Sequence, residues 1–403
     1  MNRDRTRRDL LRGTTAACVV GLAGCLSGPE ERSPGGETPT VEPIATDDSV
    51  DWPMFQFDAA NTGRAPGTGP TEDVAERWSF DTDGSVYSSP AVVDGTVYVG
   101  SNDGTVYAIA ADDGDERWSL DTGDAVSSSP AVVDGTVYVG SQDGTVYAIA
   151  ADSGDEEWTF ETDDKVAGSP TVADGVVYVG SNDNSLYAIA ADDGDKEWAF
   201  ETGEAVQRAP AVADGTVYVG SADQTLYAVD IESEEERWSV STHARIQSRP
   251  TVADGVVYVG SNDNNVYAID DESGSIRWRF ETENSVTSSP AVVENAVYAG
   301  SFDGNVYALS PSAAETDGDD TPGPETYYWN GGGFRAVRSS PVVVGDSLYV
   351  GNEDGSIYAL SAETGETRWR FRTDGWVAST PAVVDGVVYV GSGDNSVYAL
   401  EEA

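Results

Sequence analysis

A tripeptide of the type Ser-Ser-Pro, variable in its first two positions, recurs eight times along this chain at nearly constant spacing. The prolines that end it are Pro90, Pro130, Pro170, Pro210, Pro250, Pro290, Pro341 and Pro381. Consecutive prolines are 40 residues apart, except that 51 residues separate Pro290 from Pro341. A fixed period of about 20–50 residues indicates an array in which each repeat is one small structural unit.

A tryptophan stands 12 residues before each of these prolines. The eight are Trp78, Trp118, Trp158, Trp198, Trp238, Trp278, Trp329 and Trp369. Because Trp329 keeps its distance to Pro341, the extra residues of the long step lie before it, in the acidic stretch around 310–324. A buried indole removes roughly 150–250 Å² from water. We interpret all eight as structural residues that dock neighbouring repeats.

Each repeat contains four short runs with the composition of β-strands. In residues 90–122 they are AVV, TVYVG, TVYAIA and ERWSLDT, separated by three Asp-Gly pairs. Asp-Gly supplies the positive φ angles that tight hairpin turns need. The second and third runs are apolar at nearly every position, which is typical of strands covered on both faces. Four antiparallel strands stacked between neighbours describe a propeller blade, and the β-branched content excludes a helical solenoid.

The two ends of the repeat array complement each other. The last repeat stops at 397–400, after its third strand. The strand around Trp78 is a fourth strand, and the three strands that would precede it in a repeat are missing. The N-terminal strand is therefore expected to complete the last blade and close the ring, which removes exposed sheet edges. The sequence predicts an all-β fold with one eight-bladed propeller of four-stranded antiparallel blades over residues 51–403, as a monomeric domain.

The chain is strongly acidic, with 71 Asp and Glu against 22 Lys and Arg and a formal charge of −49. Such an excess destabilises a compact state through self-repulsion, unless salt shortens the Debye length to about 3 Å at 1 M. We therefore expect a protein of a salt-loving organism; a calcium-loaded surface is the alternative. Nucleic acid is not expected as a partner, because the chain lacks a basic stripe for phosphates.

The first 24 residues are predicted to be an export signal. Arg7 and Arg8 lie in a segment that resembles the twin-arginine signal, and the uncharged stretch 13–24 is too short for the roughly 20 residues that span a bilayer. Leu-Ala-Gly-Cys, ending at Cys25, resembles a lipobox whose cysteine carries a lipid. The alternative is an ordinary basic N-terminus with a chance cysteine.

Residues 25–50 are rich in Pro, Gly, Thr and acids, which is typical of a disordered tether. Together with the lipobox, this segment predicts a cell-surface, extracytoplasmic domain attached to the cytoplasmic membrane through Cys25. The only other cysteine is Cys18, so the propeller can hold neither a disulfide nor a thiolate metal site. Its single histidine, His243, excludes a multi-histidine metal cluster.

The stretches 267–278 (YAIDDESGSIRW) and 358–369 (YALSAETGETRW) resemble the repeat of pyrroloquinoline-quinone (PQQ) propellers, Y-A-L-D-x-x-T-G-x-x-x-W. The resemblance implies that the indoles wedge between adjacent blades. Three repeats have Ala110, Ala150 and Ala190 at the family's aspartate position. The opening 52–63 also resembles the segment that precedes many such propellers.

Two families share this repeat. Quinoprotein alcohol dehydrogenases hold PQQ and calcium on the ring axis and use an aspartate base, and many have a disulfide that this chain lacks. BamB-type lipoproteins are non-catalytic eight-bladed propellers. Since anchor, size and blade count match the latter better, we expect a binding or scaffold protein for a protein or glycan partner, without a cofactor, from a haloarchaeon. A PQQ- and calcium-dependent dehydrogenase is the alternative.

Basic residues are scarce, yet several fall between a tryptophan strand and the next blade, in connections expected to share one face of the ring. They are Lys165, Arg208, Arg245, Arg249, Arg335 and Arg338, together with His243, and Trp376 lies there as a candidate stacking residue. A cluster of cations at a channel mouth could hold a small anionic solute, which is a third candidate function. Alternatively, these arginines offset nearby acids. No convincing general base is present.

The lipobox interpretation is tested by Cys25→Ser. This change removes the thiol that would carry the lipid, so the protein is expected to move from the membrane fraction to the soluble fraction. Cell fractionation and immunoblotting measure this. Arg7→Lys with Arg8→Lys provides the contrast, because it should retain the precursor in the cytoplasm. Membrane retention of Cys25→Ser would contradict the anchor.

Overall fold

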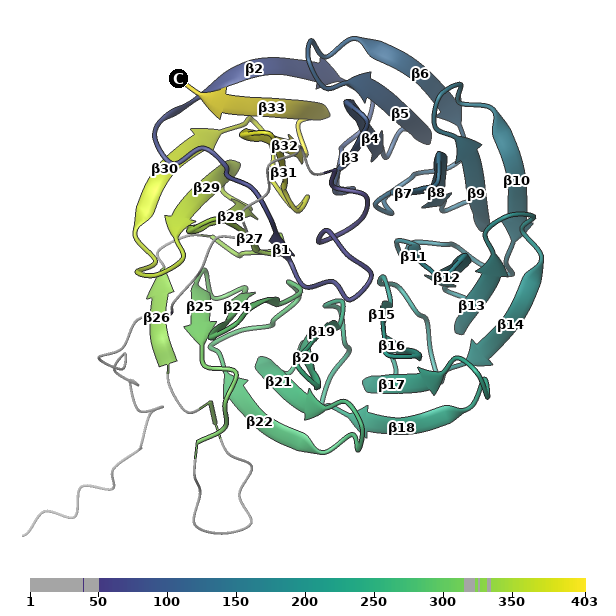
Figure 1. The fold of residues 1–403 in the computed structure, drawn as a ribbon, viewed down its shortest axis with the longest axis vertical. Helices are drawn as coiled ribbons and strands as arrows, with labels where there is room; N and C mark the ends of the chain where they lie inside the picture. The colour runs from purple at the N-terminus through teal and green to yellow at the C-terminus, as the bar shows by residue number, and fades with distance from the viewer. Residues whose placement is uncertain (1–38, 40–50, 315–322, 325–326, 332–334) are drawn as a thin grey trace, which may run out of the picture. The chain divides into compact units, whose positions relative to one another are not determined.

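Each repeat folds into one blade, as the computed structural model shows for residues 39, 51–314, 323–324, 327–331 and 335–403. Blade 1 contains β3 (Ala91–Val93), β4 (Thr96–Gly100), β5 (Thr105–Ala110) and β6 (Glu116–Asp121), paired antiparallel in chain order. Eight such sheets stand around a common axis, with the first strand of each innermost (Figure 1). The fold prediction is confirmed. Residues 1–38 and 40–50, with Arg7, Arg8 and Cys25, lie outside the described residues.

The remaining blades repeat this order. Blades 2 to 4 are β7 (Ala131–Val133), β8 (Thr136–Gly140), β9 (Thr145–Ala150) and β10 (Glu156–Glu161); β11 (Thr171–Ala173), β12 (Val176–Gly180), β13 (Ser185–Ala190) and β14 (Lys196–Glu201); and β15 (Ala211–Ala213), β16 (Thr216–Gly220), β17 (Thr225–Asp230) and β18 (Glu236–Ser241). Blades 5 and 6 are β19 (Thr251–Ala253), β20 (Val256–Gly260), β21 (Asn265–Asp270) and β22 (Ile276–Glu281); and β23 (Ala291–Val293), β24 (Ala296–Gly300), β25 (Val306–Leu309) and β26 (Tyr327–Gly331).

The last two blades use strands from both ends of the chain. Blade 7 is β27 (Val342–Val344), β28 (Ser347–Asn352), β29 (Ser356–Ser361) and β30 (Thr367–Arg372), with the short β1 (Arg64–Ala65) added parallel to β27. Blade 8 is β31 (Ala382–Val384), β32 (Val387–Gly391), β33 (Ser396–Glu402) and β2 (Val74–Asp81). Trp78 pairs with Ala399, so the N-terminal strand closes the ring as predicted.

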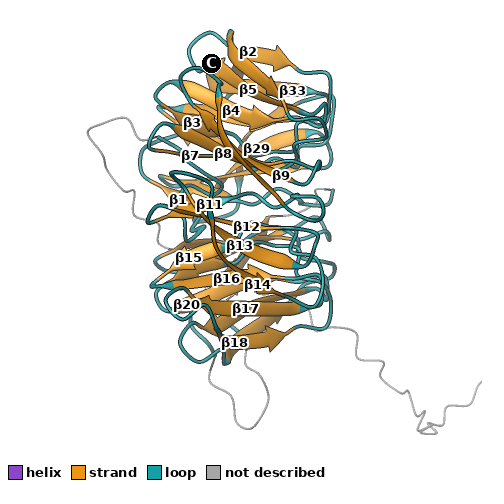
Figure 2. Ribbon diagram, turned by 90° about the vertical axis from the view of Figure 1, so that its right-hand side faces the viewer, coloured by secondary structure: helices purple, strands orange, loops and turns teal. Residues whose placement is uncertain are grey.

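Burial follows the position of a strand within its blade. The second strand β4 is buried throughout, whereas the outermost strand β6 buries only Trp118 fully. The sheets stack on each other around the ring, as the side view shows (Figure 2). The outermost strands carry most of the exposed strand residues. This explains the continuous apolar runs in the middle strands and the acidic, alternating pattern in the fourth.

Adjacent blades are joined by a repeated contact between an indole and a turn. Trp118 of blade 1 donates its Nε1–H to the carbonyl oxygen of Ala151 in blade 2 at 2.8 Å, and Tyr98 donates its hydroxyl to the same oxygen at 3.2 Å. A Cβ at Gly154 would lie 2.8 Å from the indole, so the turn needs glycine here, where φ is +76°. The tryptophan of one blade therefore leaves room only for glycine at this position in the turn of the next blade.

Seven of the eight indoles make this hydrogen bond in the described residues. The donors are Trp78, Trp118, Trp158, Trp238, Trp278, Trp329 and Trp369. The exception is Trp198, which faces blade 4, where Glu234 replaces the usual glycine and has a φ of 61°. Trp198 is nonetheless buried to 6% exposure and packs on Tyr178. This junction therefore keeps the packing of the indole without the hydrogen bond.

Residues 51–65 form a cap across the ring axis, visible as the purple segment in the centre of Figure 1. The cap supplies a backbone carbonyl oxygen to the innermost strand of six blades in turn. The acceptors are Trp52, Pro53, Ala59, Ala60, Thr62 and Gly63, and the donors are Val92, Val132, Val212, Val252, Val292 and Val343. These bonds satisfy amides of the inner strands that no other strand pairs.

Two buried amide side chains fasten the cap to the ring of prolines. Gln56 donates to the carbonyl oxygens of Pro290 and Pro341, each at 3.3 Å, and Asn61 donates to Pro210 and Pro250, each at 3.1 Å. Both side chains are essentially inaccessible, at 0% and 1% exposure. The sequence predicted no role for residues 52–63. Within the described residues, no helix is long and apolar enough to cross a membrane.

The docking contact predicts a large stability difference between two tryptophans. Trp278 is fully buried, whereas Trp376 is 51% exposed and lies off the repeat. Trp278→Ala should lower the free energy of unfolding by about 3–5 kcal/mol through lost packing. Trp376→Ala is the matched control and should change it by less than about 0.5 kcal/mol. Denaturant unfolding at constant salt measures both, and equal effects would contradict the docking role.

Candidate functional site

The connections that lead from the outer strand of one blade to the inner strand of the next converge on the ring axis. The residue before each proline is usually Ser or Thr, and its hydroxyl accepts the backbone N–H of the equivalent residue one blade earlier. These bonds run Arg249 to Ser289, Ser289 to Ser340, Ser340 to Thr380, Thr380 to Ser89, Ser89 to Ser129 and Ser129 to Ser169, at 2.8–3.2 Å. We call this the hydroxyl ring.

The hydroxyl ring is interrupted at blades 4 and 5. Ala209 occupies the position before Pro210 and has no hydroxyl, and Arg249 occupies the next one. The Arg249 side chain turns back across this gap and donates Nη2–H to the Ser169 hydroxyl at 3.1 Å. Its guanidinium also lies 3.5 Å above the centre of the Phe55 ring, which belongs to the cap. Arg249 is therefore held from both sides while its Nε stays buried without a partner.

Arg208 marks a second departure from the repeat, two residues before Pro210. Six blades have serine at this position, and Ser128 shows its usual role by donating to the Gly140 carbonyl oxygen at 2.7 Å. Arg208 is a much longer, charged side chain at a position built for a small one. Its Nε is buried and has no hydrogen-bond partner among the described residues. Arg208 and Arg249 thus place two guanidiniums beside each other, at positions where most other blades have the small hydroxyl of Ser or Thr.

These residues line a cavity of about 410 Å³ on the axis, which we call the funnel. Its lining is Tyr87, Ser89, Ser127, Ala167, Gln207, Arg208, Gln247, Arg249, Thr287, Arg338, Ser340, Trp376, Ala378 and Thr380. All of them precede the prolines, whereas the backbone carbonyl oxygens of the cap accept from residues that follow the prolines. The cap therefore lies on the other side of the proline ring and forms the base of the funnel. The lining contains three arginines and no carboxylate.

The electrostatics of the funnel disfavour the charges it contains. Burial, and then the neighbouring Arg208 guanidinium, lower the pKa of Arg249. Burial, and then Arg338, lower the pKa of Arg208. Each guanidinium is thus desolvated and repelled by the next one. A negative charge in the funnel would relieve both effects.

The rim of the funnel carries the two large hydrophobic side chains that are exposed in the described residues, Tyr87 at 37% and Trp376 at 51%. A Cβ at Gly393 would lie 3.2 Å from the Trp376 backbone and 3.4 Å from the Tyr87 ring, so the two residues flank this glycine. Arg338, also at the rim, pairs with Glu353 at 3.0 Å and lies over the Phe302 ring. Its charge is already compensated.

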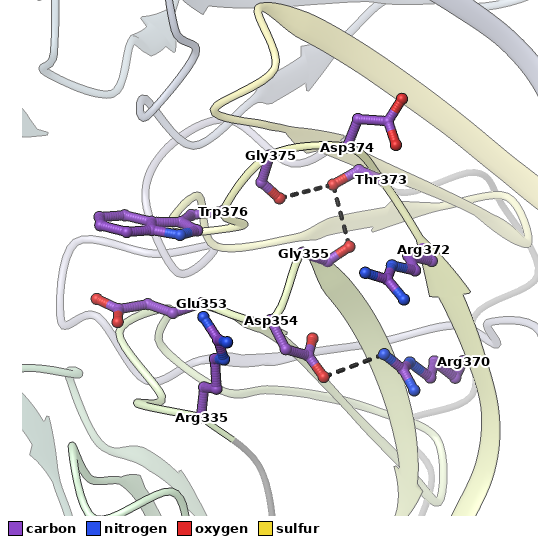
Figure 3. Close-up of a pocket in the computed structure, with 10 residues that line it drawn as sticks. All are labelled: Arg335, Glu353, Asp354, Gly355, Arg370, Arg372, Thr373, Asp374, Gly375 and Trp376. Carbon is purple, nitrogen blue, oxygen red and sulfur yellow. Dashed lines mark hydrogen bonds and ion pairs between the residues drawn. The ribbon is translucent and has the colours of Figure 1, made fainter.

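A second cavity of about 320 Å³ adjoins the rim near Trp376 (Figure 3). Arg335, Arg370 and Arg372 line it, but so do Glu353, Asp354 and Asp374. Arg370 pairs with Asp354 at 3.1 Å, which the dashed line in Figure 3 marks. Because three acids and three bases line this cavity, it has no net charge that would favour an anion.

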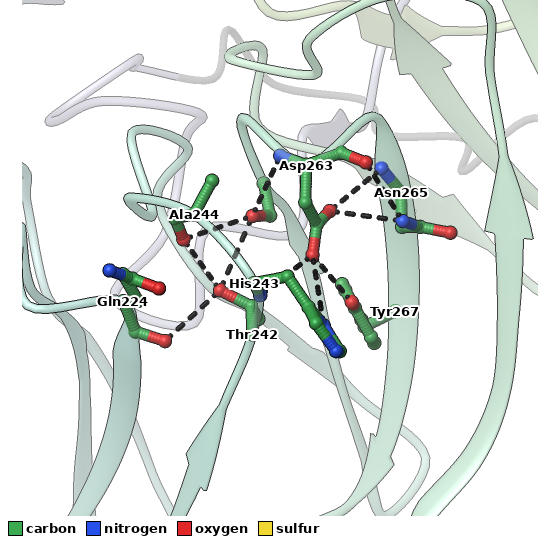
Figure 4. Close-up of polar contacts among 8 residues, drawn as sticks. Gln224, Thr242, His243, Ala244, Asp263, Asn265 and Tyr267 are labelled. Atoms are coloured by element: carbon green, nitrogen blue, oxygen red, sulfur yellow. Dashed lines mark hydrogen bonds and ion pairs between the residues drawn. The ribbon is translucent and has the colours of Figure 1, made fainter.

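The remaining predicted residues do not reach the funnel. His243 is exposed, its ring Nδ1 lies 3.9 Å from Asp263, and its backbone N–H donates to the same carboxylate at 3.0 Å (Figure 4). Lys165 donates to Gln142 at 3.0 Å, and Arg245 lies 4.0 Å from Glu204. Arg335 lines the side cavity instead. Of the eight candidates, the structure brings Arg208, Arg249, Arg338 and Trp376 together.

The aspartate carboxylates that recur in each blade accept hydrogen bonds within turns. Asp103 accepts the backbone N–H of Thr105 at 2.9 Å and the Tyr107 hydroxyl at 3.1 Å, and all eight blades repeat the tyrosine contact. In blade 3 burial and the hydrogen bond to Asp183 raise the pKa of Tyr187 to about 12. These pairs are therefore fixed donors and acceptors. Among the described residues no cluster of three acidic, histidine or cysteine side chains could hold a metal.

Sequence reasoning missed the hydroxyl ring, Tyr87, Gln207, Gln247 and the cap. A signal was present in the repeat itself. The position three residues before the proline holds six different residue types in the eight blades. The residue four positions before the proline, by contrast, is Val in seven blades and Ile246 in the eighth. Variation at one position of an otherwise uniform repeat marks the place where the blades differ in chemistry.

Comparison with known proteins agrees with this architecture. A family model described as "Outer membrane protein assembly factor BamB" matches residues 70–126, 116–209, 199–321 and 319–403. Together these segments include β2 and all the strands that follow it. No curated protein matches the chain in a sequence comparison.

Several solved structures share the fold. BamB from Moraxella catarrhalis is 21% identical, with a TM-score of 0.68 over 81% of this chain and 97% of that one. Quinohemoprotein alcohol dehydrogenase from Comamonas testosteroni is 16% identical, with a TM-score of 0.74 over 88% and 81%. The computationally designed Ika8 protein is 18% identical, with a TM-score of 0.69 over 80% and 98%. At these identities the likeness shows the fold alone.

Proposed function

The chain belongs to the family of outer membrane protein assembly factor BamB, and on that premise we propose that it is a non-catalytic scaffold that binds a protein or glycan partner. We further propose that a lipid on Cys25 anchors it to the outer side of the cytoplasmic membrane in a salt-loving organism. The observation that carries the proposal is the lining of the funnel, which offers three guanidiniums and no carboxylate.

The same lining argues against the dehydrogenase alternative. Calcium binds oxygen ligands, chiefly carboxylates. A dehydrogenase with PQQ and calcium on the ring axis would therefore need carboxylates beside the quinone. In the described residues the funnel presents Arg208, Arg249 and Arg338 instead, which repel a divalent cation. The residues present do not fit a metal-dependent quinone site. An aspartate base is missing there too, because the repeated carboxylates are bound in turns.

The funnel rim is the best candidate for the partner surface. Tyr87 and Trp376 are exposed side by side, and exposed aromatic residues are enriched in the centres of protein interfaces. The outer strands are a poorer candidate, because they are acidic and repeat the same pattern in every blade. A rigid ring that presents one distinctive surface suits a scaffold.

Partner binding is tested by site-specific photocrosslinking of the full chain in cells. A photoreactive residue replacing Trp376 should yield a discrete adduct with a partner, because the proposed contact surface surrounds that position. The matched control replaces Asp134, an exposed turn residue between β7 and β8, which should yield none. Equal crosslinking from both positions, or from neither, would count against a partner at the rim.

The cofactor alternative predicts a different outcome. Full-length protein incubated with PQQ at constant high salt should show no gain in PQQ affinity on addition of calcium, measured by calorimetry, and no dye reduction with alcohols or sugars. This follows from the repulsion between the guanidiniums of the funnel and a cation. Micromolar binding of PQQ together with calcium, accompanied by dye reduction, would replace the scaffold with a quinoprotein dehydrogenase.

A further inference from the structure

Two arginines in the funnel lack the kind of ion pair that eight other arginines of the described residues make. Arg237, Arg277 and Arg368 each pair with an aspartate at 2.7–2.8 Å. Arg208 and Arg249 pair with no carboxylate in the described part of the chain, although the protein has 71 acidic residues against 22 basic ones. In so acidic a chain, a funnel lining without carboxylates is a selective arrangement.

An unpaired buried charge costs stability, so it needs a compensating partner or a function. Arg208 and Arg249 both have a buried Nε without a hydrogen-bond partner. The other blades show that the fold has no need of them, because serine occupies the equivalent position in six blades for Arg208 and in five for Arg249. A charge is therefore not required at either position to form a blade, although the Arg249 side chain does bridge to Ser169 across the gap in the hydroxyl ring.

The contacts of Arg249 orient the guanidinium without neutralising it. The Phe55 ring lies 3.5 Å below it and the Ser169 hydroxyl accepts one of its N–H groups at 3.1 Å. Both partners are uncharged. They fix a planar group with its remaining donors free, which is the arrangement that bidentate carboxylate binding requires. Arg338 differs, since Glu353 already compensates it at 3.0 Å.

We propose that the funnel is a binding site for a small organic dianion whose two carboxylates pair with Arg208 and Arg249. A volume of about 410 Å³ lies within the range of small-molecule sites, roughly 300–1,000 Å³. The amides of Gln207 and Gln247 and the hydroxyls of Ser89 and Thr287 supply neutral hydrogen bonds around the ligand. Two uncompensated positive charges match two negative ones, so a monoanion leaves one guanidinium unpaired.

This inference goes beyond the proposed function and does not depend on it. A scaffold could hold such a ligand whatever its partner, and the partner surface at the rim lies outside the base of the funnel. The lowered pKa values of Arg208 and Arg249 agree with the inference, because both report a site that disfavours its own positive charge.

The test is calorimetric titration of the full-length protein with succinate and citrate, at constant high ionic strength. Succinate should bind saturably, whereas its neutral diamide should not. Arg208→Ser and Arg249→Ser restore the residue of other blades and should keep the fold, and each should weaken succinate binding by at least about tenfold, the loss expected for a charge-assisted hydrogen bond. Arg245→Ala is the matched control, because Arg245 lies outside the funnel.

A thermal measurement separates this role from a structural one. Without ligand, Arg208→Ser should raise the melting temperature, because it removes a buried unpaired charge. Succinate at a saturating concentration should raise the melting temperature of the unchanged protein by more than that of the variant. A lower melting temperature of Arg208→Ser, or succinate binding equal in all proteins, would overturn the proposal.

The outcome also distinguishes this proposal from the scaffold proposal. Succinate binding without a crosslinked partner would support the anion site and remove the scaffold. A partner without succinate or citrate binding would remove the anion site alone. PQQ binding without binding of either simple carboxylate would overturn the dianion proposal.

Discussion

The contact on which the ring depends is an indole N–H that donates to a carbonyl oxygen of the neighbouring blade. Trp118 makes it to Ala151, and Tyr98 and Gly154 complete the same junction. The junction joins each blade only to its two neighbours. Every blade is therefore covered on both faces only when the junction is repeated around the whole circle. Two junction contacts join the two ends of the chain: Trp369 donates to Pro70, and the Tyr389 hydroxyl donates to Ala111.

A ring built from one repeated junction is nearly symmetric, so specific chemistry needs a departure from the repeat. The departures gather at the axis beside blades 4 and 5, where Ala209 interrupts the hydroxyl ring and Arg208 and Arg249 replace serine. The cap closes the opposite side of the proline ring through Gln56 and Asn61. The result is a closed-ended funnel with two free positive charges inside an acidic protein.

The fold could be predicted because its signal is periodic. Spacing alone placed Trp78 beside the last repeat, and its pairing with Ala399 confirms the closure. The funnel was predictable only in part. Arg208 and Arg249 stood out as bases in acidic repeats, but Lys165 and Arg245, one residue before a buried Val or Ile, extend away from the axis. The cap has no counterpart in any repeat, and Gln56 bonds to residues more than 230 positions away, so no local pattern reveals it.

The most direct measurement of the central claim is an experimental structure of the full-length protein determined in the presence of succinate. The account predicts density for the dianion in the funnel, with one carboxylate on Arg208 and the other on Arg249, and the Phe55 ring still beneath the second guanidinium. A funnel that contains only water, or a carboxylate of the chain itself paired with either arginine, would contradict the account.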